Sequence, residues 1–126
     1  MAISTGGPMS ETVSWLLILD IEPGELEGFE KLMAEMVAHT RSEPGTLTYE
    51  WFVSGDGGTV HLYERYIDSA AAVAHLVGFG KHFAQRFTAA TKQVAMYVYG
   101  NADETLRRAV VAPTTEFLGP FGGFAR

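Results

Sequence analysis

Two alternating segments joined by a glycine-rich turn constrain the fold of this chain more than any other feature. Residues 46–54 and 59–67 are rich in β-branched and aromatic side chains, and they flank the turn Gly55-Asp56-Gly57-Gly58. Such a pattern predicts a β-hairpin with a loop of two or four residues. The predicted cross-strand pairs are Val53 with Val60, Trp51 with Leu62, Tyr49 with Glu64, and Leu47 with Tyr66.

Hydrophobic spacing extends this hairpin into an α+β domain. Alternation predicts two further strands, at residues 12–21 and 93–99. Helical spacing predicts helices at residues 25–42, 70–77 and 81–90, the last two separated by Gly78-Phe79-Gly80. The order β-α-β-β-α-β is the ferredoxin-like plan, in which helices cover one face of a four-stranded antiparallel sheet.

The predicted domain spans residues 12–100 and leaves a segment at each end. Residues 1–11 show no helical or strand period and are expected to form a disordered tail. Residues 101–126 combine a short amphipathic helix at 103–111 with an aromatic tail. Because exposed aromatic side chains are unfavourable in water, we expect Phe117-Leu118 to dock, either as an added strand on a partner subunit or over the chain's own helices.

The sheet face opposite the predicted helices is too apolar to remain in water. One helix pair covers only one face, and an uncovered apolar face of this size marks an interface. We therefore expect a homodimer in which two sheets pack face to face as a dimeric α/β barrel with an isologous interface. The predicted interface residues are Leu16, Ile18, Phe52, His61, Tyr63, Tyr97 and Tyr99.

Composition argues against several classes of function. The 126 residues suffice for one domain with a single core. Nine basic against fifteen acidic residues give a net charge of −6, which argues against nucleic acid and anionic membranes as partners. The absence of cysteine removes disulfides and thiolate metal sites and fits a cytoplasmic protein. With no HExxH-type histidine pairing either, we expect no metal site.

Motifs in the hairpin and the following helix are typical of one family. The run EPGTLTYEWF is followed by HLYERYIDSAAAVAHL and then by GKHF. Over roughly residues 12–100, their joint order resembles the antibiotic biosynthesis monooxygenase family of dimeric α/β-barrel proteins, and the chain looks quinol monooxygenase-like. The matching positions are Pro44-Gly45, Tyr49-Glu50, Glu64-Arg65-Tyr66, His75 and His82.

The resemblance implies oxygenation without a cofactor, in which a phenol or hydroquinone reacts directly with O2 to give a quinone. Two alternatives stay open: a non-catalytic protein that binds a small ligand on the same fold, and a haem-binding or haem-degrading member. Two departures weigh against haem. Leu17 stands near the asparagine of the haem-degrading branch, and neither His75 nor His82 cleanly matches its haem-ligating histidine.

The helix-facing side of the sheet is predicted to line the pocket for a small aromatic substrate. His75 reaches this pocket from the second helix. The wall is mostly apolar and rich in aromatic rings, which suits a flat ring. The predicted substrate-binding residues are Trp15, Leu17, Tyr49, Trp51, Leu62 and Met96.

Three side chains are candidates for catalysis, each with a structural alternative. His75 is a candidate base or ligand-orienting group because its unperturbed pKa lies near neutral; the alternative is a hydrogen bond to a backbone carbonyl. Glu64 faces an apolar layer and is a candidate base; the alternative is a structural bond to Tyr49. Tyr66 is a candidate donor to a substrate oxygen; the alternative is aromatic packing.

Overall fold

The computed structural model describes residues 10–110, 112 and 114–126 of the chain. Most of the tail predicted for residues 1–11 lies outside the described residues. The predicted end of the last helix, residue 111, lies outside them too. Between residues 10 and 110 the chain is described without interruption.

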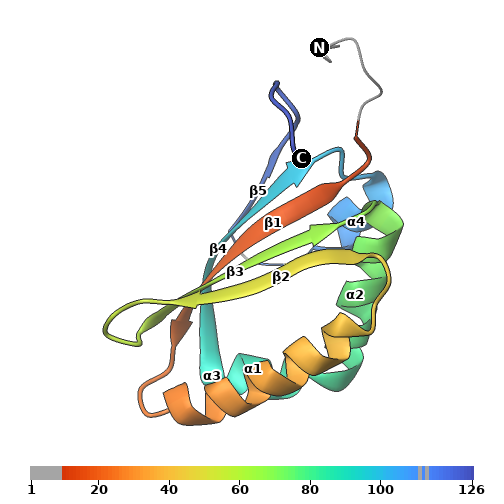
Figure 1. Cartoon of the computed structure of the whole chain (residues 1–126). Helices are drawn as coiled ribbons and strands as arrows, with labels where there is room; N and C mark the ends of the chain where they lie inside the picture. The colour runs from red at the N-terminus through yellow and green to blue at the C-terminus, as the bar shows by residue number, and fades with distance from the viewer. Residues whose placement is uncertain (1–9, 111, 113) are drawn as a thin grey trace.

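Five strands form one open sheet, and the helices lie on one side of it (Figure 1). The strands are β1 (Val13–Ile21), β2 (Thr46–Val53), β3 (Thr59–Tyr66), β4 (Thr91–Gly100) and β5 (Thr115–Leu118), in the sheet order β2-β3-β1-β4-β5. The helices are α1 (Leu26–Arg41), α2 (Ser69–His82), α3 (Ala84–Ala90) and α4 (Glu104–Ala109). The ferredoxin-like α+β fold is confirmed.

The prediction of a four-stranded antiparallel sheet misses one strand, because the observed sheet has five. The first four strands are antiparallel neighbours, but β5 pairs with β4 in parallel, so the sheet is mixed. A parallel neighbour requires a crossover connection, and α4 supplies it. Phe117-Leu118 thus form an added strand on the chain's own sheet rather than on a partner subunit.

The hairpin register is correct for three of the four predicted pairs. Val53 pairs with Val60, Trp51 with Leu62, and Tyr49 with Glu64. The fourth prediction is wrong, because a bulge near the start of β2 pairs Thr46, not Leu47, with Tyr66. A bulge inserts one extra residue into a strand and displaces it from the ladder. Leu47 is accordingly exposed.

The second helix continues through the glycines predicted to interrupt it. Residues 70–77 and 81–90 were expected to be separate, yet α2 runs unbroken from Ser69 to His82 and the break falls at Phe83. Asp68 caps α2 by accepting a hydrogen bond from the backbone N–H of Ala71 at 2.8 Å. Gly78 lies beside His39 on α1, whose Nε2 would be 3.6 Å from an added Cβ, an ordinary van der Waals contact.

The core lies between the helices and the sheet, whereas the opposite sheet face is open. Strand register places the predicted interface residues together on that open face: Leu16 pairs with both Tyr63 and Tyr97, and Ile18 pairs with His61. Phe52 on this face is 56% exposed. The largest fully buried side chains of the core are Trp15, Tyr66, Leu19, Met36, Leu106, Val13 and Val98.

The C-terminal segment is fastened to the domain at both α4 and β5. The backbone N–H of Asp103 donates to the Ser69 hydroxyl at the start of α2, at 3.0 Å. Leu106 of α4 is fully buried. The guanidinium of Arg107 lies 4.6 Å from the centre of the Phe117 ring on β5, a cation–π contact.

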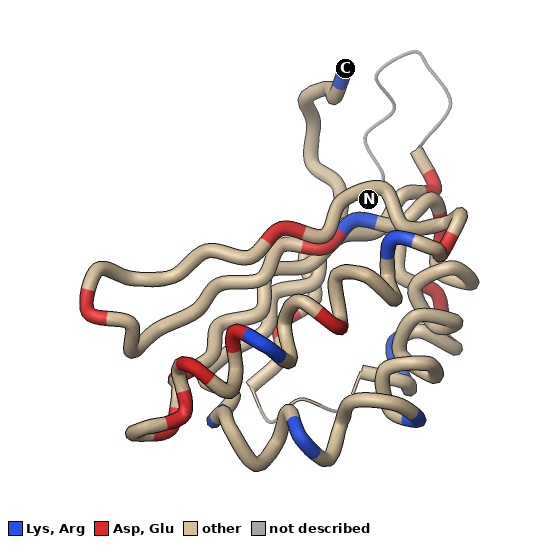
Figure 2. The backbone as a smooth tube through the Cα atoms, turned by 60° about the horizontal axis from the view of Figure 1, so that its bottom comes forward, with Lys and Arg blue, Asp and Glu red and all other residues tan. Residues whose placement is uncertain are grey.

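Charged positions are spread along the whole of the described chain (Figure 2). Acidic positions gather around the start of α1, and basic positions are dispersed. None of the described helices is both long and apolar enough to cross a membrane.

Gly45 fits too tightly against α2 to accept a side chain. A Cβ at this position would stand 2.5 Å from the Cβ of Ala71. The Gly45 carbonyl also accepts the backbone N–H of Ile67 at 3.0 Å, which ties the turn to the end of β3. The Pro44-Gly45 turn therefore sets the distance between β2 and α2.

We expect Gly45→Ala to lower the free energy of unfolding by about 1–3 kcal/mol, because overpacking forces α2 away. Gly80→Ala is the matched control: no atom lies within 4 Å of its added Cβ, and Ala raises helix propensity. It should be neutral or stabilising by up to about 1 kcal/mol. Urea unfolding followed by circular dichroism measures both. A Gly45→Ala variant as stable as the parent would contradict the tight fit.

Candidate functional site

A cavity of about 270 Å³ lies between the sheet and helices α2 and α3. Its wall is mostly apolar, and besides the tyrosine and tryptophan side chains its polar residues are Glu64, His75 and Gln93. The residues predicted to bind a substrate all line it: Trp15, Leu17, Tyr49, Trp51, Leu62 and Met96. They share one cavity, and their part in substrate binding stays a prediction.

Glu64 is the polar centre of the site. The residue is only 3% exposed, and strand pairing holds it between Trp15 on β1 and Tyr49 on β2. Its Oε1 accepts a hydrogen bond from the Tyr66 hydroxyl at 2.5 Å, and its Oε2 accepts one from the Trp15 indole N–H. The predicted structural bond to Tyr49 is not the one formed. A carboxylate accepts about four hydrogen bonds, so Glu64 has capacity beyond these two.

His75 lies between two carboxylates. Its Nε2 is 3.1 Å from Oε1 of Glu64, and its Nδ1 is 2.9 Å from Oε1 of Glu43. Only the imidazolium form donates from both ring nitrogens at once. Burial alone lowers the pKa of His75, but the hydrogen bonds and charges of Glu64 and Glu43 outweigh it, so the pKa is raised above its ordinary value.

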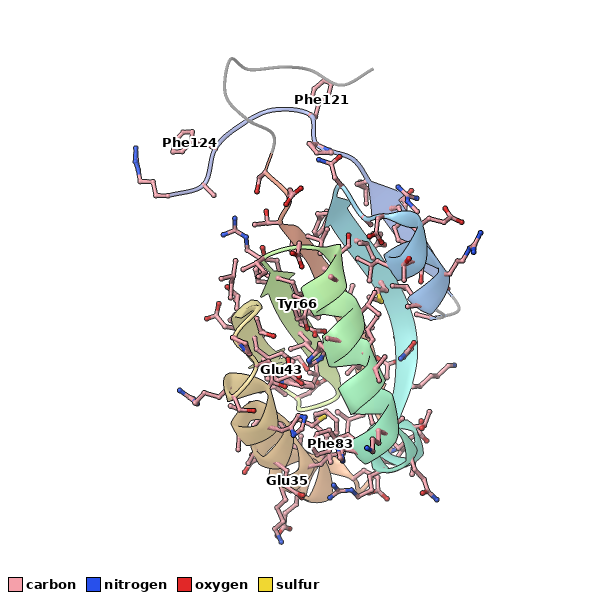
Figure 3. All side chains as sticks on the ribbon, turned by 90° about the vertical axis from the view of Figure 1, so that its right-hand side faces the viewer. Glu35, Glu43, Tyr66, Phe83, Phe121 and Phe124 are labelled. Carbon is pink, nitrogen blue, oxygen red and sulfur yellow. The ribbon has the colours of Figure 1, made fainter. Side chains whose placement is uncertain are left out.

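Glu43 is a site residue that the sequence analysis missed. It follows α1, its side chain is 22% exposed, and its Oε1 also accepts the Thr46 hydroxyl at 2.8 Å. Figure 3 shows Glu43 at the end of α1, beside α2. The Glu-Pro-Gly run signalled a helix end, but no local pattern connects this glutamate with a histidine 32 residues away.

Tyr66 lies behind Glu64 and is not part of the cavity wall. Its side chain is fully buried, and its hydroxyl donates to Glu64. Burial, together with the charge of Glu64, raises the pKa of Tyr66, so it stays a protonated donor. Its ring packs 4.9 Å from that of Trp15 and 5.3 Å from that of His75. The geometry thus favours packing and orientation of Glu64 over contact with a substrate oxygen.

Two further parts of the wall escaped the sequence analysis. A bulge in β4 pairs Ile18 with Ala95 but Leu19 with Gln93, which turns Gln93 rather than Val94 toward the helices. The end of α4 and the residues that follow it add three more lining residues, which are Ala109, Val110 and Ala112. Strand alternation does not reveal a bulge, and a single sequence does not show where a crossover passes.

The second histidine of the motif does not reach the cavity. The His82 ring lies 5.1 Å from that of His39, so it bridges α2 and α1. His75 alone of the two lines the cavity. Within the ranges that the structure describes, no group of three His, Cys, Asp or Glu side chains is arranged to hold a metal ion.

A family model described as antibiotic biosynthesis monooxygenase matches residues 17–85. The match covers more than half of the chain, so this protein belongs to the antibiotic biosynthesis monooxygenase family, as the resemblance predicted. A search of curated proteins finds no match.

Solved structures agree with this assignment. MupZ from Pseudomonas fluorescens is 26% identical with a TM-score of 0.85, and the similarity covers 98% of this chain and 96% of that one. Rv0793 from Mycobacterium tuberculosis is 28% identical with a TM-score of 0.58, covering 74% and 97%. SnoaB from Streptomyces nogalater, described as a cofactor-independent oxygenase, shares the fold at 20% identity and a TM-score of 0.63, covering 76% and 97%.

The raised pKa of His75 predicts a pH-dependent stability. A group whose pKa rises on folding contributes stability that is complete below its unfolded pKa, about 6.5, and is lost as the pH rises through the folded pKa. The free energy of unfolding should therefore fall as the pH is raised above about 6.5. Urea unfolding between neutral and alkaline pH should show this loss in the parent and not in His75→Gln.

The control for this experiment is His82→Gln, which changes an exposed histidine at the end of α2 that does not line the cavity. It should keep the pH dependence of the parent. An identical pH dependence in His75→Gln and in the parent would show that the pair of carboxylates does not stabilise a charged His75.

Proposed function

We propose that this chain is a cofactor-independent monooxygenase that oxidises a small phenol or hydroquinone with O2 to a quinone. The observation that carries the proposal is a buried carboxylate in the wall of an aromatic-lined cavity. Oε1 of Glu64 is occupied by Tyr66 and His75, but Oε2 accepts only from Trp15 among the described residues. One acceptor position on Oε2 thus remains for a substrate hydroxyl. The description of SnoaB as a cofactor-independent oxygenase supports this reaction class.

The size and polarity of the cavity favour a single-ring substrate. A volume of about 270 Å³ is below the range of typical drug-sized sites. The negatively charged Glu64 accepts a hydrogen bond from a hydroxyl and repels a carboxylate. A porphyrin is larger than this cavity, and both nitrogens of His75 already face carboxylates, so the haem alternative has no support in the geometry.

In the proposed reaction Glu64 takes the proton of the phenol. The phenolate passes one electron to O2, and the resulting radical pair forms a carbon–oxygen bond and a peroxide, which takes the proton back from Glu64. Loss of a ring proton and cleavage of the oxygen–oxygen bond then give the quinone and one water molecule. The substrate supplies all four electrons that reduce O2, so the balance needs no other reductant. His75 orients Glu64, and the apolar wall excludes water.

One observation favours the alternative of a ligand-binding protein without turnover. Glu64 already receives hydrogen bonds from three side chains of the core, which is what a purely structural carboxylate would also show. The same cavity would then hold a small hydroxylated ring and release it unchanged. Oxygen consumption separates the two functions.

We expect oxygen uptake with single-ring hydroquinones to exceed autoxidation without added metal or flavin. Glu64→Gln should lower kcat by about 100-fold or more, since it removes the base. Glu27→Gln, an exposed glutamate on α1, is the control and should keep the parent rate. An oxygen electrode measures all three. Uptake at the autoxidation rate across the panel, or an unaffected Glu64→Gln variant, would contradict the proposal.

We also propose that the open sheet face pairs with a second copy of the chain. The face carries contiguous aromatic and aliphatic side chains, with Leu16 at its centre between Tyr63 and Tyr97. Burial, together with the neighbouring Tyr97 and Tyr63, raises the pKa of Tyr99 on this face. Covering this face would remove a large apolar surface from water.

Leu16→Asp should convert the dimer into a monomer, because it places a charge at the centre of the interface. Light scattering coupled to size exclusion should give twice 13.7 kDa for the parent and 13.7 kDa for the variant. Lys31→Asp on the exposed side of α1 should leave the dimer intact. A parent that runs as a monomer at all concentrations would refute the pairing.

A further inference from the structure

The geometry points to Glu43 as a positioning residue of this site, and we propose that it sets the charge of Glu64 through His75. This inference rests on the proposed function for its kinetic consequence, but the linkage of the three side chains stands on contacts alone. Glu43, His75 and Glu64 form a continuous row from the partly exposed loop after α1 to the cavity wall. Glu43 itself does not line the cavity.

The first step is the surroundings of His75. Its side chain is 7% exposed, and the titratable groups facing it come from three directions. Glu43 reaches it from the loop before β2, Glu64 and Tyr66 from β3, and the ring of Tyr49 from β2 at 5.5 Å. Burial and the charge of Glu64 raise the pKa of Tyr49, as burial and Glu64 do for Tyr66, so both rings stay neutral. The charge of His75 is therefore set by the two carboxylates.

The second step compares one carboxylate with two. A buried histidine and a single buried glutamate can exist as an ion pair or, after transfer of one proton, as a neutral pair that avoids the desolvation of two charges. A second carboxylate at 2.9 Å on the other nitrogen favours the imidazolium. With His75 held as a cation, Glu64 stays an anion able to accept the proton of a phenol. Without Glu43, the population of the neutral His75–Glu64 pair increases, and a protonated Glu64 no longer acts as a base.

The third step is how Glu43 is held in place. Its Oε1 accepts the Thr46 hydroxyl at 2.8 Å as well as facing His75. Thr46 stands at the bulge of β2, and the adjacent Gly45 packs directly against α2. The tight turn therefore delivers the carboxylate to the histidine on the neighbouring helix.

Nuclear magnetic resonance of the ligand-free protein, labelled with ¹⁵N at histidine, tests the linkage first. The parent should show both ring nitrogens of His75 protonated at neutral pH. In Glu43→Gln, His75 should titrate at lower pH, and Glu43→Asp should restore part of the shift. The other three histidines are internal references, and Glu35→Gln, in an exposed ion pair with Arg86, should leave His75 unchanged. An unchanged titration of His75 in Glu43→Gln would overturn the inference.

Kinetics with a hydroquinone that the parent oxidises form the second arm. Glu43→Gln should lower kcat by about 10- to 100-fold with little change in KM, because Glu43 does not touch the substrate. The alkaline limb of the pH profile should move to lower pH, since activity requires a charged His75 and the variant loses that charge sooner. An unmoved limb would contradict the inference.

The titration and the kinetic experiment distinguish a failure of the linkage from a failure of the proposed oxygenase function. If no phenol is oxidised but His75 titrates at lower pH in Glu43→Gln, the oxygenase proposal is wrong and the linkage is right. If oxidation occurs but His75 titrates as in the parent, the linkage is wrong and the oxygenase stands. Should Glu43→Gln not fold, Thr46→Val removes the hydroxyl that holds Glu43, and the same downward shift in His75 is expected from it.

Discussion

The burial of one carboxylate is the constraint on which the rest of this site depends. A glutamate with almost no exposure is tolerated only where donors surround it, and Glu64 receives them from three different elements. Trp15 belongs to β1, Tyr66 to β3 and His75 to α2, so the same hydrogen bonds that satisfy the charge also fasten the helix to the sheet. Stability and chemistry are therefore coupled, because the hydrogen-bond donors that stabilise the buried Glu64 carboxylate also orient it toward the cavity.

The segment that follows β4 contributes Ala109, Val110 and Ala112 to the wall of the cavity. Several structural neighbours cover about 70% of this chain but nearly the whole of their own, for example 71% against 92% for a protein from Methanosarcina mazei. That share is about what β1 to β4 and the helices between them make up. The segment after β4 holds α4 and β5, and it brings Val110 into the cavity wall. MupZ is similar over 98% of this chain, so an extended form of the domain recurs within the set of solved structures.

The sequence predicts well what depends on neighbours along the chain. Alternation and a Gly-Asp turn sufficed for the register of Trp51 with Leu62, and hence for the wall of the cavity. The sequence predicts poorly those features that depend on a single inserted residue or on a contact between residues far apart in the chain. Bulges moved Leu47 out of its pair and turned Gln93 into the cavity, and α2 continues through Gly78 instead of breaking there. The sequence predicted that the first helix ends near Glu43, but the role of this residue in the site became visible only through its tertiary contact with His75.

The central claim is that Glu64 receives the hydroxyl of a small ring while still bonded to Trp15. Titration of the oxygen-free protein with hydroquinone, followed through the indole N–H resonances of the two tryptophans, tests this most directly. Because the ligand and Trp15 would share Oε2 of Glu64, the Trp15 resonance should shift in a saturable manner, and toluene, which has no hydroxyl, should not reproduce the shift. A Trp15 resonance that stays in place, or that moves equally with toluene, would contradict the account.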